Sequence, residues 1–172
     1  SMAAVLLLVI PILGLFIKIS PMSFINALGN KEVFSPLFLS IATSTVSTLI
    51  AFVLGIAVAY VLVFKDIPFK KSFSTLVTLP LVLPPSVAGY LLLITFGRYG
   101  TVGRFLNRIG ITVMFTIEAI ILAQVFVILP FIINSLKASF EDLDPNYRKI
   151  SQILGASEWY TFRKVIMPLS RG

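Results

Sequence analysis

Long uncharged apolar runs alternate with short polar segments along the 172-residue chain. Four runs are candidate membrane-spanning helices, at about 3–17, 36–64, 73–97 and 115–136. A helix needs about 20 residues to cross the hydrocarbon core of a bilayer, so the first run is interpreted as a span whose N-terminal end is incomplete. The pattern predicts an all-α polytopic membrane protein with at least four spans.

Prolines interrupt the third run, at Pro80 and at the pair Pro84-Pro85. Proline removes a backbone donor and clashes with the preceding helical turn. Two structures stay open: a helix that begins after Pro85 behind an interfacial lead-in, or a broken helix that lines a path. The candidate pathway or gate residues are Pro80, Pro84, Pro85, Ser86 and Gly89. Plain interfacial structure is the alternative role for the same stretch.

Small residues recur at four-residue spacing in the second run, at Ala51, Gly55 and Ala59. This spacing lets two membrane helices approach closely. The fourth run contains an acid, Glu118, near one end. We interpret Glu118 as an interfacial carboxylate, with a proton relay as the alternative.

Composition supports the membrane assignment and excludes several chemistries. Hydrophobic residues make up 58% of the chain and charged residues 12%, whereas a soluble domain carries about 25% charged residues. The chain has no Cys and no His, which excludes disulfides, thiol nucleophiles, Ser-His triads and the common zinc sites. We therefore expect no cofactor, no metal site and no enzymatic activity of its own.

The net charge of +7 comes from 14 Lys and Arg that lie between the apolar runs. This distribution is typical of topology signals and lipid headgroup contacts, and we expect no nucleic-acid partner. The 65–71 loop and the segment 137–172 together carry nine basic residues, against five on the opposite side. The positive-inside tendency places the nine-charge side in the cytoplasm of a multi-pass cell-membrane protein. The arginines between 98 and 114 remain candidates either for headgroup contacts or for receiving an outside partner.

Two short amphipathic helices are predicted within the polar segment 137–172. Asp144-Pro145 is a good helix start, and Gly155 suits the left-handed position that ends a helix. Ser157 can cap a second helix, which Pro168 closes. The apolar positions of the two helices are Tyr147, Ile150, Ile153, Leu154, Trp159, Phe162, Val165 and Ile166. Such a pair forms a knob for a partner's groove, or alternatively lies on the membrane surface.

The spacing of Gly155, Val165, Met167 and Pro168 resembles the coupling-loop signature of binding-protein-dependent ABC importer permeases. That signature is Glu-Ala-Ala, three residues, Gly, nine residues and Ile-x-Leu-Pro. Here Lys149-Ile150-Ser151 occupies the Glu-Ala-Ala positions. The resemblance implies an ATPase-coupling loop at 144–168, with contact residues Ser151, Gly155, Ala156, Ser157, Trp159, Phe162 and Pro168.

Further stretches resemble the molybdate/tungstate permease subfamily, at 79–90, 96–100 and 140–145. Sulfate and thiosulfate permeases are close relatives of that subfamily, and their substrates remain the alternative. The resemblance covers roughly Pro36 to the end of the chain. Because such permeases carry more spans after the coupling loop, we expect the chain to be truncated at its C-terminus.

The resemblance implies the transmembrane domain of a type I importer, spread over residues 1–172 as one domain. It implies a homodimer of permease subunits, cytoplasmic ABC ATPase subunits that hydrolyse ATP, and an extracytoplasmic binding protein that delivers the oxyanion. The permease itself needs no catalytic residue. A membrane scaffold or enzyme without an ATPase partner is the remote alternative.

Overall fold

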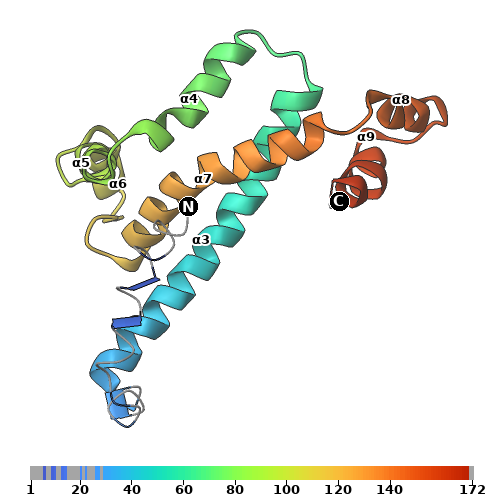
Figure 1. Cartoon of the computed structure of the whole chain (residues 1–172). Coiled ribbons are helices and arrows are strands. Elements are labelled where there is room, and N and C mark those ends of the chain that lie inside the picture. The colour runs from blue at the N-terminus through green and yellow to red at the C-terminus, as the bar shows by residue number, and fades with distance from the viewer. Residues whose placement is uncertain are drawn as a thin grey trace. The chain divides into compact units, whose positions relative to one another are not determined.

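The computed structural model describes residues 29–170 and a few isolated residues before them, and this part of the chain is helical without any strand. The chain divides into two units, Ser1–Ala42 and Thr43–Gly172. Figure 1 labels the helices α3 (Lys31–Phe64), α4 (Lys70–Val82), α5 (Pro85–Phe96), α6 (Thr101–Arg108), α7 (Ile117–Glu141), α8 (Pro145–Ile153) and α9 (Glu158–Thr161). The π-helical turn η1 (Phe162–Ile166) and α10 (Met167–Leu169) follow α9.

Two helices, α3 and α7, are long and apolar enough to cross a membrane. The pair α4 and α5 would make a third crossing if its bent halves form one span. The predicted run 3–17 lies for the most part outside the described residues. The prediction of at least four spans therefore stays a prediction, and the described part of the chain accounts for two or three of them.

Helix α3 begins at Lys31, five residues before the predicted start at Pro36. The Asn30 side-chain oxygen accepts a hydrogen bond of 3.1 Å from the Glu32 backbone N–H, which satisfies one of the free donors at the helix start. Pro36 stands close to this end and costs the helix a single backbone hydrogen bond. The helix therefore extends beyond the uncharged run at its N-terminal end, because a capped start outweighs one proline near the terminus, and the limits of the span itself stay a prediction.

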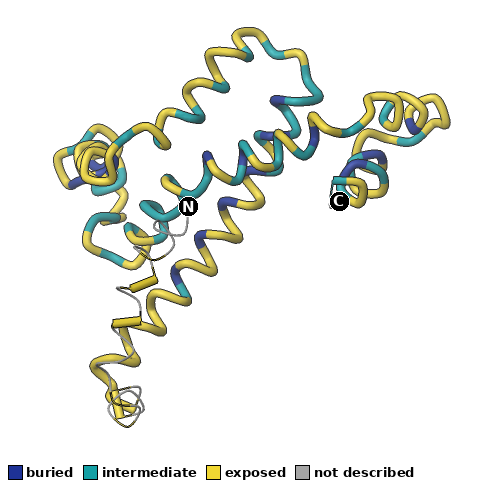
Figure 2. Tube along the Cα trace, viewed as in Figure 1, coloured by how far each residue is buried: buried dark blue, intermediate teal, exposed yellow. Residues whose placement is uncertain are grey.

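The buried side of α3 within the second unit is a stripe of small residues that confirms the predicted four-residue spacing. Its members are Thr43, Ser47, Ala51, Gly55 and Ala59; Figure 2 colours buried positions dark blue along the tube. A Cβ added to Gly55 would lie 2.6 Å from Ile132 Cγ2 of α7, so the two helices meet closely there. Small side chains allow this approach between membrane helices.

A polar contact that the sequence analysis missed joins the same two helices. Ser47 Oγ donates to Gln124 Oε1 at 2.7 Å, and Gln124 Nε2 donates to Thr43 Oγ1 at 3.3 Å. Buried polar side chains in a membrane helix pair need such partners, because hydrocarbon supplies none. Gln124 therefore fixes the register of α7 against α3.

The proline-rich third run is a broken helix. α4 and α5 are both helical, and they meet at a bend of 114° around Leu83 and Pro84. A helix thus stands on both sides of the break, as a broken helix requires; whether α4 is an interfacial lead-in or lines a path stays a prediction. Pro80 lies inside α4, while Pro85 occupies the first position of α5, where the missing N–H costs nothing.

A close turn connects α5 to α6, and three glycines make it possible. A Cβ on Gly103 would collide with the carbonyl oxygens of Gly97 and Phe96, and one on Gly100 would collide with those of Ile94 and Thr95. The turn leads into the short helix α6, whose last residue is Arg108. Glu118 stands exposed in the first turn of α7, where the helix dipole favours an acid.

Candidate functional site

Helix α8 starts as the local sequence predicts. Asp144 accepts a hydrogen bond of 2.9 Å from the Asn146 backbone N–H, and Pro145 occupies the first helical position. The Asp side chain satisfies one of the donors that a helix start leaves unpaired. The first helix of the C-terminal segment (residues 144–168) is therefore fixed at its entry by its own two leading residues.

The same helix ends in a Schellman motif at Gly155, which confirms the predicted left-handed position. Gly155 has a φ of 81°, its N–H donates to Gln152 O at 3.0 Å, and the Ala156 N–H donates to Ser151 O at 3.1 Å. Glycine adopts this conformation without the clash that a Cβ brings. The residue type at 155 thus sets the angle at which the chain leaves α8.

The second helix of the segment is capped by Ser157, which accepts a hydrogen bond of 3.2 Å from the Tyr160 N–H. Helical structure then runs from Glu158 to Leu169, so Pro168 does not close the helix as predicted. A π-helical turn accommodates it: the Met167 N–H bonds to Phe162 O, five residues back. Pro168 has no N–H to donate, and the wider turn keeps its ring from the preceding carbonyls.

A buried hydrogen bond locks the two helices of the segment together. The hydroxyls of Ser151 and Thr161 lie 2.9 Å apart, and the two residues are 8% and 1% exposed. Ser151 belongs to the predicted coupling residues, and its hydroxyl is used inside the segment. The sequence analysis missed Thr161, because a lone threonine ten residues away carries no local signal.

Aromatic side chains fasten the segment to the ends of α3 and α7. The Phe162 ring lies edge-on to Tyr60 at 5.2 Å and to Phe140 at 6.3 Å between ring centroids. Beneath these rings, Ala59 and Ile166 complete a small buried core. Phe162, predicted as a contact residue for a partner, thus packs on this chain's own helices.

One carboxylate collects the charged contacts of the segment. Lys65 Nζ donates to both oxygens of Glu158, at 2.8 and 2.6 Å, and Arg148 Nη2 lies 3.4 Å from Oε1. The hydrogen bond and the charge of Lys65 hold the pKa of Glu158 below its ordinary value, and Arg148 adds to the effect. Glu158 is therefore ionised at neutral pH and bound to two cations.

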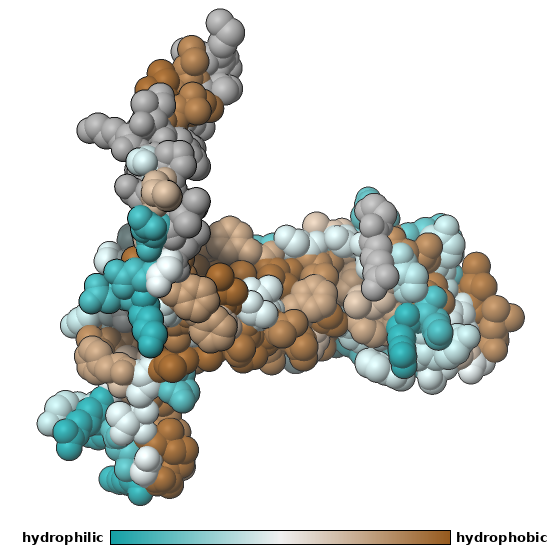
Figure 3. Space-filling view, turned by 90° about the horizontal axis from the view of Figure 1, so that it is seen from below, coloured by the Kyte–Doolittle hydropathy of each residue, from teal (hydrophilic) through white to brown (hydrophobic). Residues whose placement is uncertain are grey.

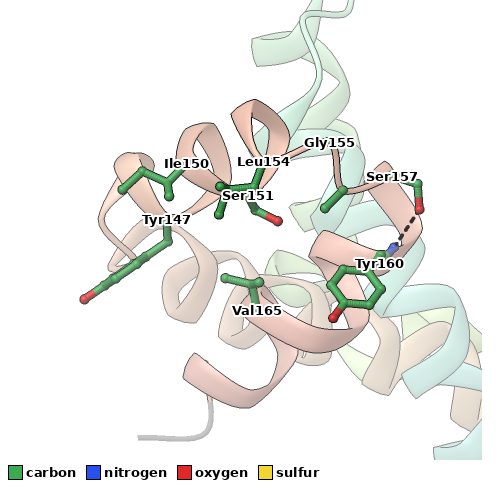
Figure 4. Close-up of a pocket in the computed structure, with 9 residues that line it drawn as sticks. Tyr147, Ile150, Ser151, Leu154, Gly155, Ser157, Tyr160 and Val165 are labelled. Carbon is green, nitrogen blue, oxygen red and sulfur yellow. Dashed lines mark hydrogen bonds between the residues drawn. The ribbon is translucent and has the colours of Figure 1, made fainter.

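The exposed side of the segment is an open groove of about 820 Å³ that curves around the Schellman turn (Figure 4). Its lining includes Ile150, Leu154, Gly155, Tyr160 and Val165, so it is mostly apolar. Outside the groove, the described surface is apolar over the long helices and mixes hydrophilic with hydrophobic side chains over the C-terminal helices (Figure 3). An apolar groove among polar side chains is the surface expected of a docking site.

Large apolar side chains of the segment point into solvent. Ile153 and Leu154 are 83% and 80% exposed, and Trp159 is 69% exposed. Lys149, at the position where the family signature has its acid, is also exposed. The segment therefore presents apolar side chains and an exposed lysine where an acid is usual.

The candidate gate residues lie elsewhere, around the break between α4 and α5. Pro84, Pro85, Ser86 and Gly89 are exposed, whereas Pro80 is half-buried. A Cβ on Gly89 would meet nothing within 4 Å. Within the described residues, no group of His, Cys, Asp and Glu could hold a metal ion.

Known proteins resemble the chain along most of its length. Over 169 residues, it is 32% identical to the molybdenum transport system permease protein ModB of Mycobacterium bovis. The aligned residues make up 98% of this chain and 64% of that protein. Over 166 residues, it is 34% identical to the sulfate transport system permease protein CysT of Synechocystis sp.. The aligned residues make up 95% of this chain and 58% of that protein. The probable transport system permease protein NifC of Clostridium pasteurianum is 32% identical over 164 residues, 95% of this chain and 57% of that protein.

The chain spans less than two thirds of the length of these relatives. Residues 51–172 match the family described as binding-protein-dependent transport system inner membrane component. The matched range begins in α3 and includes the broken helix pair, α7 and the whole C-terminal segment. A match over this range, together with the relatives above 30% identity, shows that the chain belongs to this family of transport permeases.

Proposed function

We propose that the chain is the membrane-spanning permease part of an ATP-driven importer that takes up molybdate or tungstate. A solute-binding protein delivers the oxyanion from outside, two permease subunits form the conduit, and cytoplasmic ATPase subunits hydrolyse ATP. The C-terminal segment acts as the coupling loop on the cytoplasmic side. Residues 1–172 contribute at least four spans to this domain, and no residue of the chain is catalytic.

The construction of the C-terminal segment is the observation that carries this proposal. Capped at Asp144, turned at Gly155 and locked by the Ser151–Thr161 hydrogen bond, it is a rigid pair of helices packed on α3 and α7. Such a unit converts a movement of a partner into a movement of the spans. Its exposed groove supplies the surface that a partner would grip.

Docking of the ATPase is tested by co-purification with the full-length permease. Leu154→Asp places a charge on the groove, so we expect loss of the co-purifying ATPase while insertion is unchanged. Phe69→Asp is the matched control, since Phe69 is 84% exposed and lies outside the C-terminal segment. Equal recovery of ATPase with both variants would contradict a docking role for the groove.

Sulfate or thiosulfate is the second candidate substrate, because relatives named as sulfate permeases match nearly as much of the chain. Uptake of labelled molybdate into vesicles that hold permease, ATPase and binding protein separates the two. We expect ATP-dependent uptake that tungstate blocks and sulfate does not. Inhibition mainly by sulfate would change the substrate, and no ATP-dependent uptake of any oxyanion would leave a scaffold or an enzyme without an ATPase.

A further inference from the structure

We propose that Glu158 is a positioning residue that ties the C-terminal segment to the end of α3, so that movement of the segment reaches α3 as well as α7. The inference rests on the proposed function, since it concerns how a coupling segment passes on its motion. It assigns a role to three residues that are not among the predicted contact residues: Glu158, Lys65 and Arg148.

The two spans are connected to the segment in different ways. α7 ends at Glu141 and α8 starts at Pro145, so a few residues of backbone join them. α3 ends at Phe64, about 80 residues earlier in the sequence. Besides the indirect route through the packing of α7 on α3, only side-chain contacts can therefore join the segment directly to α3.

The carboxylate of Glu158 makes the polar part of this connection. Lys65 follows α3 directly and donates to both oxygens of the carboxylate. Charge-assisted bonds of this kind are stronger than neutral ones. Because one cation reaches both oxygens, the first residue of α9 is held at the cytoplasmic end of α3.

Arg148 closes the connection from α8. Its Nη2 lies 3.4 Å from Glu158 Oε1, and its Nη1 donates to the carbonyl oxygen of Phe64 at 3.1 Å. The guanidinium carbon also lies 5.4 Å from the centroid of the Phe64 ring. The last carbonyls of a helix lack partners within it, so Arg148 completes the end of α3 and binds Glu158 with the same group.

The apolar contact beside these charges works in the same direction. Phe162, one turn after Glu158, packs on Tyr60 of α3. An isolated surface ion pair contributes little, but here the carboxylate binds two cations from two elements next to a packed aromatic ring. The connection is thus a network, and Glu158 is the member that all its charges share.

The test uses full-length permease reconstituted with its ATPase and binding protein. Glu158→Gln keeps the shape of the side chain and removes its charge, and Lys65→Met removes the partner. We expect each to raise the ATP hydrolysed per molybdate ion taken up about fivefold, with ATPase binding unchanged. The double variant should be no worse than Glu158→Gln alone, because that change already breaks the contact with Lys65.

Glu141→Gln is the control, since Glu141 pairs with Lys137 within α7 at 3.7 Å and loses the same charge. The ATP that Glu141→Gln hydrolyses per molybdate ion taken up should equal that of wild type. Three outcomes would overturn the proposal. Glu158→Gln could hydrolyse as much ATP per molybdate ion as wild type, it could lose the ATPase, or the effects of the two changes could multiply in the double variant.

A second measurement is independent of transport. The 172 residues contain no Cys, so spin labels can be placed at Leu49→Cys on α3 and Lys164→Cys on η1, both at exposed positions. Glu158→Gln should widen the distribution of label distances about twofold, and an unchanged width would overturn the tie. If wild type takes up no oxyanion, the proposed function fails, and this width still decides the role of Glu158.

Discussion

The C-terminal segment and the proline-broken arm (α4 and α5) are both helices interrupted by a turn, but the two interruptions are held in different ways. At Gly155 the backbone is closed by two hydrogen bonds, and Ser157 caps the helix that follows. At the break in the arm, the N-cap of α5 is Pro84, which makes no side-chain hydrogen bond to the helix start. The residues around Pro84 are exposed.

The difference shows that the two turns keep their angles by different means. A part that transmits force needs a fixed internal geometry, and the C-terminal segment has paired polar groups on both sides of its turn. Hinges are a few residues that absorb changes in backbone angle. Leu83 and Pro84 each precede a proline, whose ring limits such changes, so the bend of the arm is held by proline geometry and the gate role of the residues around it stays a prediction.

The largest expected effect lies next to the arm, where α6 meets the end of α5. Gly103→Ala should lower the free energy of unfolding by about 3 kcal/mol, because the new Cβ overlaps two backbone carbonyls and forces α5 and α6 apart. Thermal unfolding in detergent measures it. Gly89→Ala, with open space around the same atom, should instead be neutral or stabilise by about 0.5 kcal/mol. Similar losses in both variants would contradict the close packing at Gly103.

The lock of the C-terminal segment should come next in size. Ser151→Ala leaves the Thr161 hydroxyl buried without its partner, and we expect a loss of about 1.5 kcal/mol in the same unfolding experiment. Combining it with Thr161→Val should recover part of the loss. Ser139→Ala is the control, since that hydroxyl bonds within its own helix. An unchanged free energy of unfolding in Ser151→Ala would contradict the rigid C-terminal segment described above.

A smaller effect on stability is expected at two glycines, Gly155 and Gly110, of which only Gly155 lies in the C-terminal segment. Gly155 and Gly110 both have a φ of 81° and open space at the Cβ position, so replacing either by Ala should cost about 1 kcal/mol. Only Gly155→Ala should also raise the ATP hydrolysed per ion transported, since it alters the angle within the segment. Normal uptake by a Gly155→Trp variant would remove the coupling role.

The smallest expected effect is on pH dependence. Because the pKa of Glu158 is lowered in the folded protein, its contribution to stability is complete above the ordinary value of 4.5 and is lost as the pH falls through the lowered value. The difference in unfolding temperature between wild type and Glu158→Gln should therefore stay constant from about pH 7 to 5 and vanish at lower pH. A difference that grows on acidification would contradict the ion pairs with Lys65 and Arg148.

The local features of the candidate site could be predicted because each depends on neighbouring residues. Asp144 and Ser157 cap helices through backbone groups two or three positions away, and Gly155 takes a conformation that its own missing Cβ allows. For Phe162, neighbouring residues do not determine the contact. Its place in an apolar pattern identifies it as a packing residue, but the pattern does not say whether the partner ring belongs to this chain or to another.

The sequence by itself determined a helical membrane protein, the small-residue stripe on α3 and the turn at Gly155, since apolar period, residue size and backbone freedom act over a few positions. Only the tertiary structure decided that Glu158 meets Lys65, that Ser151 meets Thr161 and that the arm bends by 114°. Contacts between distant residues depend on how the helices pack, and no local pattern encodes that arrangement.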